Sequence, residues 1–261
     1  MRATDAGAGS GFTIIEVAVA LFLLSLLFGS VFIPLRSQVD RRQVEETGRL
    51  LEKAREALIG YALSRGHFPC PADASSAGQE PAGTDHAAGT CPTHYGYLPA
   101  AALGFQPTDP QGYAVDAWGT AANRLRYAVS DQAAGPAGNT RAFTRVNGMR
   151  AAGIAALGDP ALALLHVCAS GTGVVAGASC GKAPTVVSTA PVVIWSSGPN
   201  APTGGAGVDE AQNPNRNGGS EDRVFVMRVR SMAAGNEFDD IVTWVPMTRL
   251  IGALVAAGQL P

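Results

Sequence analysis

A single carboxylate, Glu16, lies near the start of an apolar run that extends over residues 11–35 and carries no other charged side chain. An acidic side chain at the centre of a membrane-spanning helix costs roughly 2.5 kcal/mol or more. A chain that keeps Glu16 in such a run is therefore expected to use it. The segment before the run, residues 1–10, is short and polar and contains Arg2 and Asp5.

The residues Gly11-Phe12-Thr13-Ile14-Ile15-Glu16 resemble the N-terminal motif of type IV prepilins and type II secretion pseudopilins. The resemblance implies that a prepilin peptidase cleaves between Gly11 and Phe12 and that Phe12 is then N-methylated. It also implies that Glu16 acts in assembly by pairing with the free amine of Phe12 in a neighbouring subunit. The chain departs from the family at Ser10, where Lys or Arg is usual.

A secretory signal peptide and an ordinary signal anchor are the alternatives to a prepilin N-terminus. A secretory signal peptide has a basic start, a shorter apolar core and a small-residue cleavage site, and the run fits that description less well than it fits a signal anchor. Charge counting alone favours the opposite orientation, because Arg2 precedes the run while Arg36, Arg41 and Arg42 follow it. The topology therefore rests on the resemblance and on the cysteines.

These observations predict three segments. Residues 1–11 are a leader, residues 12–64 a long helix, and residues 65–261 a globular α+β domain. Within the helix, residues 12–35 are predicted to cross the inner membrane once. Residues 36–64 are predicted to be amphipathic, because apolar side chains recur there at helical spacing. Gly66 and Pro69 are predicted to end the helix, and the globular domain is predicted to be periplasmic or to lie on an extracellular filament.

The predicted fold class is α+β and pilin-like: a long N-terminal helix, membrane-spanning in its first half, packed on an antiparallel sheet. Apolar segments at 184–195, 223–229 and 240–245 indicate strands. Residues 247–257 indicate a short closing helix. A helix followed by several strands is typical of α+β proteins.

The four cysteines, Cys70, Cys91, Cys168 and Cys180, all follow the apolar run. An even number in that position indicates disulfides in an oxidising compartment. Of the three possible pairings, proximity favours Cys70–Cys91 and Cys168–Cys180, each worth about 3 kcal/mol in the chain-entropy model. A zinc site is the alternative, but neither the cysteines nor the four histidines show the spacing of zinc ligands.

A polar, glycine-rich stretch between the predicted strands at 184–195 and 223–229 is similar to the calcium-binding loop of the major pseudopilin. The resemblance implies oxygen ligands that suit calcium, and the candidates are Asn200, Asp209, Asn213 and Asp222. A solvated loop without a metal is the alternative. Calcium is therefore the one candidate cofactor, and the sequence does not by itself assign it. Asp239 and Asp240 precede the last strand and are expected to cap a turn, pair with an arginine or assist this loop.

The sequence therefore predicts a structural subunit, a minor pilin or pseudopilin, of a type IV pilus or type II secretion filament. Its expected partners are the prepilin peptidase, other subunits, the membrane and an inner-membrane assembly platform. A net charge of −2 with 15 % charged residues does not suggest nucleic-acid binding. No nucleophile and base stand at a recognisable spacing, so an enzyme is not expected. The alternative is a signal-anchored periplasmic binding protein or enzyme.

Overall fold

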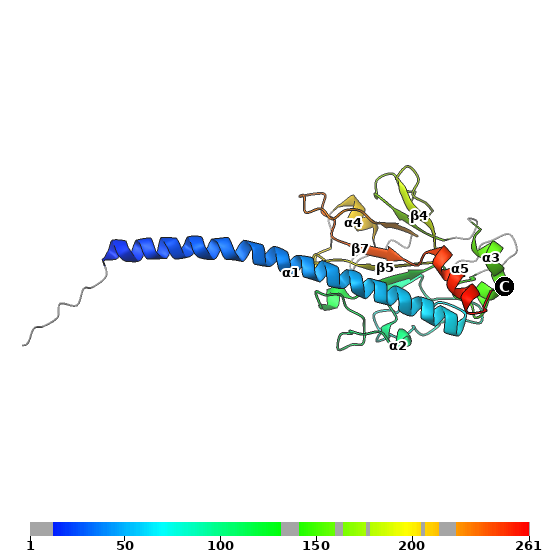
Figure 1. Cartoon of the computed structure of the whole chain (residues 1–261). Helices are drawn as coiled ribbons and strands as arrows, with labels where there is room; N and C mark the ends of the chain where they lie inside the picture. The colour runs from blue at the N-terminus through cyan, green and yellow to red at the C-terminus, as the bar shows by residue number, and fades with distance from the viewer. Residues whose placement is uncertain are drawn as a thin grey trace, which may run out of the picture. The chain divides into compact units, whose positions relative to one another are not determined.

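The computed structural model describes residues 13–131, 141–159, 164–175, 178–204, 207–213 and 223–260, and gives only the helical backbone for residues 26–37. Two compact units are present: residues 1–43 and residues 44–261 (Figure 1). Helix α1, Ile14–Arg65, contributes to both. It ends at Gly66, whose φ of 77° is a left-handed conformation that glycine adopts without strain.

The second unit contains seven strands among its described residues. Strands β1 (Tyr95–Tyr97), β2 (Arg126–Val129), β5 (Val192–Ser196) and β7 (Ile241–Trp244) form an antiparallel sheet in the order β1-β2-β5-β7. Strands β4 (Thr185–Ala190), β3 (Leu165–Cys168) and β6 (Val224–Val226) form a second sheet. In that sheet β3 pairs antiparallel with β4 and parallel with β6. The helices besides α1 are α2 (Ala100–Leu103), α3 (Gly148–Leu157), α4 (Val208–Gln212) and α5 (Met247–Ala256), and a 3₁₀ turn covers Ala121–Asn123.

The first sheet is buried on both faces. On one face, apolar side chains of α1 and α5, including Leu51, Leu58 and Leu250, pack against Tyr127 and Ile194. On the other face, the second sheet covers it: the rings of Trp195 in β5 and Phe225 in β6 lie 5.0 Å apart between their centroids. Helices, first sheet and second sheet therefore form three successive layers.

Residues 184–195, which the sequence predicts to be one strand, contribute to two strands in two different sheets. Pro191 separates β4 from β5, and its ring removes the N–H that a continuous ladder would need. Alternation and β-branched residues continue across the break, so the pattern by itself does not reveal it. The chain passes from the second sheet to the first at this residue.

The predicted fold class is wrong in two respects. Within the residues that the structure describes, no helix is both long enough and apolar enough to cross a membrane, so a membrane-spanning first half is not found. The described part of the apolar run ends at residue 25, and α1 from residue 38 onward carries many charged side chains. The second error is the single antiparallel sheet, because the domain has two sheets and the second is mixed. The predicted single-pass location in an inner membrane is wrong for the first of these reasons.

Candidate functional site

The first candidate site is the beginning of α1. Gly11 and Phe12, the predicted cleavage and methylation residues, lie outside the described residues. Thr13 and Glu16 form a reciprocal pair: the Glu16 N–H donates to Thr13 Oγ1 at 3.3 Å, and the Thr13 N–H donates to Glu16 Oε2 at 3.4 Å. This T-x-x-E arrangement is a capping box, which satisfies two N–H groups that a helix start otherwise leaves unpaired.

The capping box is a role for Glu16 that the sequence interpretation missed, although its signature was present in the sequence. The carboxylate also stands in the first turn of α1, where a negative charge interacts favourably with the helix dipole. The structure therefore explains an acid at this position without a membrane or a partner. It leaves the predicted assembly role of Glu16 untested.

The same stretch of α1 exposes most of its apolar surface. Glu16 is surrounded in sequence by eight exposed large apolar side chains: Ile14, Ile15, Val17, Val19, Leu21, Phe22, Leu23 and Leu24. Exposed apolar residues are normal one at a time, but a contiguous group of this kind marks an interaction surface.

The second candidate site is a buried group of three carboxylates, here called the acidic cluster: Glu210, Asp239 and Asp240. One carboxylate oxygen from each lies within 4.8 Å of the other two, and the side chains are between 1 % and 9 % exposed. Glu210 lies in α4, whereas Asp239 and Asp240 directly precede β7. Oxygen-only donors at such spacing suit a hard cation such as Ca²⁺.

Close backbone approach positions the acidic cluster. The turn after β5 passes so near Asp239 that a Cβ on Gly198 would lie 2.6 Å from the Asp239 carbonyl oxygen. Gly198 also has a φ of 62°, so glycine is required there for both reasons. The next turn residue, Asn200, donates its N–H to Asp239 Oδ2 at 3.3 Å and its side-chain amide to Glu210.

The electrostatics of the acidic cluster are unfavourable when all three groups are ionised. Burial, reinforced by the neighbouring Glu210, raises the pKa of Asp239 to about 7. Burial, together with the charges of Glu210 and Asp239, raises the pKa of Asp240 well above its usual range. Glu210 Oε2 and Asp239 Oδ1 are buried and have no hydrogen-bond partner. Buried carboxylate oxygens without donors are rare and call for a proton or a cation.

The structure brings together only part of the predicted calcium set. Asn200 contacts Glu210 and Asp239, and the Asn213 amide donates to Asp240 Oδ2 at 2.8 Å. Asp209 faces elsewhere: its carboxylate accepts from the Gly171 N–H at 2.6 Å and pairs with Arg228 at 3.0 Å. Asp222 lies outside the described residues.

Sequence reasoning did not single out Glu210 as a ligand, and it gave Asp239 and Asp240 only a supporting part. Adjacent Asp209 and Glu210 look equivalent in sequence, but a short helix turns them to opposite sides. A groove of about 190 Å³ lies beside the cluster and is lined in part by Asp239, Asp240 and Arg228. The groove is also lined by Arg230 and by apolar side chains such as Val44 and Met227, and it is smaller than the roughly 300–1,000 Å³ of most pockets for organic molecules.

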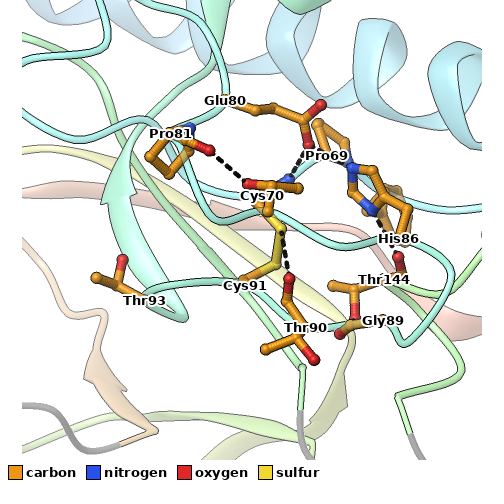
Figure 2. The surroundings of a disulfide bond; sticks show 12 residues. Pro69, Cys70, Glu80, Pro81, His86, Gly89, Thr90, Cys91, Thr93 and Thr144 are labelled. Carbon is orange, nitrogen blue, oxygen red and sulfur yellow. Dashed lines mark hydrogen bonds and ion pairs between the residues drawn. A yellow bond between two sulfur atoms is a disulfide. The ribbon is translucent and has the colours of Figure 1, made fainter.

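The cysteines form Cys70–Cys91 and Cys168–Cys180 disulfides, the pairing that proximity favours. Figure 2 shows the first disulfide with Glu80 and His86 beside it. Ligand atoms of Cys70, Glu80 and His86 lie within 4.8 Å of one another, but Cys70 sulfur is bonded to Cys91 and the other two side chains bond to each other. This group is an ion pair next to a disulfide and not the zinc site considered as an alternative.

Comparison with known proteins adds no assignment to either site: no family model, no curated protein and no solved structure matches this chain.

Proposed function

We propose that this protein is a structural subunit of a type IV pilus or type II secretion filament, cleaved between Gly11 and Phe12 by a prepilin peptidase. The observation that carries the proposal is the exposed apolar start of α1, which begins within the GFTIIE motif. Packing such segments against one another in a filament removes apolar surface from water, which is worth about 25 cal/mol per Å². The role is assembly and not catalysis.

Cleavage before Phe12 would give Glu16 a second partner. The new amine of Phe12 is a cation only four residues from Glu16 in sequence, and the same amine of a neighbouring subunit offers an equivalent charge. Pairing between subunits would compensate a carboxylate that assembly buries, and it would set the axial register of the helices. The capping hydrogen bonds from Thr13 are long, at 3.3 and 3.4 Å, and are exchanged easily for a charged donor.

Processing is tested by the N-terminal mass of the protein from cells with and without a prepilin peptidase. A peptidase-dependent start at N-methylated Phe12 is expected. A chain that keeps Met1, or that is cut elsewhere, would contradict the filament proposal and favour an anchored binding protein or enzyme.

Two substitutions at Glu16 separate assembly from capping. Glutamine serves in a capping box as glutamate does, so Glu16→Gln keeps the cap and removes the charge, whereas Glu16→Ala removes both. If the charge pairs with a neighbouring amine, both variants lose incorporation into filaments to a similar extent, measured as the ratio of filament to cell-associated protein. Normal incorporation of Glu16→Gln would leave Glu16 with the capping role alone.

We also propose that the acidic cluster binds Ca²⁺. Three buried carboxylates with two unpaired oxygens supply the hard oxygen donors that this ion prefers, and the side-chain amide of Asn200 lies beside Glu210. A bound divalent cation would remove the repulsion among Glu210, Asp239 and Asp240. Because the ligands come from α4 and from the start of β7, binding would join two segments distant in sequence.

Thermal or urea unfolding with and without CaCl₂ tests this proposal. At a free Ca²⁺ concentration about 100 times the Kd, binding should add about 2.7 kcal/mol to the free energy of unfolding. Asp240→Asn should abolish the gain. Asp209→Asn is the matched control, since Asp209 lies outside the cluster, and it should retain the gain. An equal gain in Asp240→Asn and wild type would place the calcium elsewhere.

A further inference from the structure

The His86 ring faces a hydrogen-bond acceptor at each nitrogen. Nδ1 lies 2.7 Å from the carbonyl oxygen of Thr144, and Nε2 lies 2.7 Å from Oε1 of Glu80. A carbonyl oxygen cannot donate, and an ionised carboxylate can only accept. Both contacts are hydrogen bonds only when each ring nitrogen carries a proton, so the geometry is that of an imidazolium.

Glu80 is held as a carboxylate. The same oxygen that faces His86 also accepts the Cys70 N–H at 2.6 Å. Burial alone would raise the pKa of Glu80, but the hydrogen bonds from His86 and Cys70 outweigh burial and lower it. For His86 burial alone would lower the pKa, but the bonds to Glu80 and Thr144 and the charges of Glu80 and Asp85 outweigh it and raise the pKa.

The groups around the neighbouring rings of His86 and His67 favour a positive charge on His86 and not on His67. The His67 ring lies 3.9 Å from the His86 ring between centroids, and its Nδ1 contacts the Phe68 carbonyl oxygen at 3.0 Å. Burial, and then the positive charges of His86 and Arg65, lower the pKa of His67 despite that bond and the attraction of Glu80. The edge of the Tyr61 ring packs on His67. The titratable and charged groups facing the pair are therefore Glu80, Asp85, Arg65 and Tyr61.

His86 connects two segments distant in sequence. The loop closed by the Cys70–Cys91 disulfide carries Glu80 and His86, and residues 141–147 carry Thr144 (Figure 2). Uncharged bonds support the same contact: Val146 N–H donates to the His86 carbonyl at 2.9 Å, and Thr144 Oγ1 donates to the Gly89 carbonyl at 2.6 Å. These bonds do not titrate, whereas the two bonds of the His86 ring do.

We propose that His86 is a pH-sensitive latch that, when protonated, fastens the disulfide-closed loop of residues 70–91 to residues 141–147, and that releases this contact when it loses its proton. Neutral His86 can donate to only one of its two acceptors. The other part-buried acceptor then loses its hydrogen bond from the ring and faces a ring nitrogen without a proton, which is costly. The proposal rests on contacts within residues 44–261 and does not depend on the function proposed above.

The pH range follows from the directions of the two shifts. The pKa of His86 is raised above its ordinary 6.5, so its stabilising contribution is complete below 6.5 and is lost as the pH rises through the raised value. The pKa of Glu80 is lowered below 4.5, so its contribution is present above 4.5 and is lost as the pH falls through the lowered value. The latch is thus closed in mildly acidic solution and opens on the alkaline side.

Amide hydrogen exchange of the full chain between pH 6 and pH 9 tests the latch after correction for the intrinsic rate. The Cys70 and Val146 amides should lose protection as the pH rises, by at most about tenfold per pH unit for one proton released. Amides of β5 and β7 serve as the reference and should keep theirs. Protection of Cys70 and Val146 that does not change with pH in the wild type would overturn the proposal.

Two amide substitutions sharpen this test. In Glu80→Gln a neutral amide can accept from the Cys70 N–H and donate to neutral His86, so the pH dependence should flatten. Asp85→Asn is the control, because Asp85 is an exposed neighbour whose Oδ1 accepts from the Ala87 and Ala88 N–H groups, and asparagine can still accept both. The control should keep the size of the pH dependence and move its midpoint to lower pH, because it removes the charge of Asp85. The same dependence in Glu80→Gln as in the wild type would contradict the role of the Glu80–His86 pair.

Discussion

Two polar clusters of the same unit, one part-buried and one buried, differ in how their negative charges are compensated. Beside the Cys70–Cys91 disulfide, Glu80 receives hydrogen bonds from His86 and from a backbone N–H, so the negative charge is compensated within the chain. Between α4 and β7, Glu210, Asp239 and Asp240 face one another, and two of their oxygens have no donor.

The difference shows what a buried carboxylate needs. Glu80 receives a hydrogen bond from the cation of His86, whereas at Asp239 the positive charge of Arg230 does not outweigh burial and the neighbouring Glu210. A self-compensated cluster is a structural element whose behaviour follows pH. A cluster of like charges instead gains free energy when a proton or a metal ion enters it.

The largest expected effect comes from the disulfide at the compensated cluster. Replacing Cys70 and Cys91 together by alanine should lower the free energy of unfolding by about 3 kcal/mol, because the open chain regains the entropy of the closed loop. The disulfide closes a sequence separation of 21 residues against 12 for Cys168–Cys180. Removal of the Cys168–Cys180 disulfide should therefore lower the free energy of unfolding by about 0.5 kcal/mol less than removal of Cys70–Cys91. A larger loss for Cys168–Cys180 in urea unfolding would contradict the loop-entropy explanation.

The next effect is the pH dependence of the acidic cluster in calcium-free solution. The pKa of Asp239 is raised from 3.8 to about 7 in the folded protein, so the folded state binds more protons than the unfolded state between these values. Its contribution to stability must then fall as the pH rises from 4 to 7. We expect a loss of about 3 kcal/mol, which Glu210→Gln should reduce by removing the neighbouring charge. A wild-type curve with the same slope as the Glu210→Gln curve would show that the two carboxyl groups do not interact.

The smallest effect is the most direct comparison, because it makes one chemical change in both clusters. At pH 7 without calcium, Glu80→Gln should cost about 1 kcal/mol, since it removes the charge from a compensated pair. Asp240→Asn should gain about 1 kcal/mol, since a neutral amide replaces a carboxyl group whose ionisation is opposed by burial and by its neighbours. Chemical unfolding measures both, and changes of the same sign would show that the two environments do not differ as their contacts indicate.

Much of the local structure could be predicted from residue patterns. Apolar spacing located α5 at Met247–Ala256 and β7 at Ile241–Trp244 close to their predicted positions, because side-chain periodicity reflects the face that each element buries. The break at Pro191 was missed because β-branched residues occur on both sides of it, although β4 is largely exposed and β5 is fully buried. The membrane span was predicted from an apolar run, and the structure, within its described residues, contains no helix that meets the requirement.

The two candidate sites also differ in how far the sequence alone could predict them. The relation of Thr13 to Glu16 is local, so the sequence by itself contains it, although we first interpreted Glu16 as a partner for another subunit. The acidic cluster joins residues that are about thirty positions apart, and the sequence could not show that Glu210 faces Asp239 while its neighbour Asp209 faces Arg228.

The sequence by itself determined the positions of the local elements, the capping signal at Glu16 and the motif on which the filament proposal rests. These depend on residues close together along the chain. Only the tertiary structure decided that His86 stands between two acceptors and that three carboxylates share one buried space. Those arrangements depend on which faces pack together, and burial there changes the charge that each group can carry.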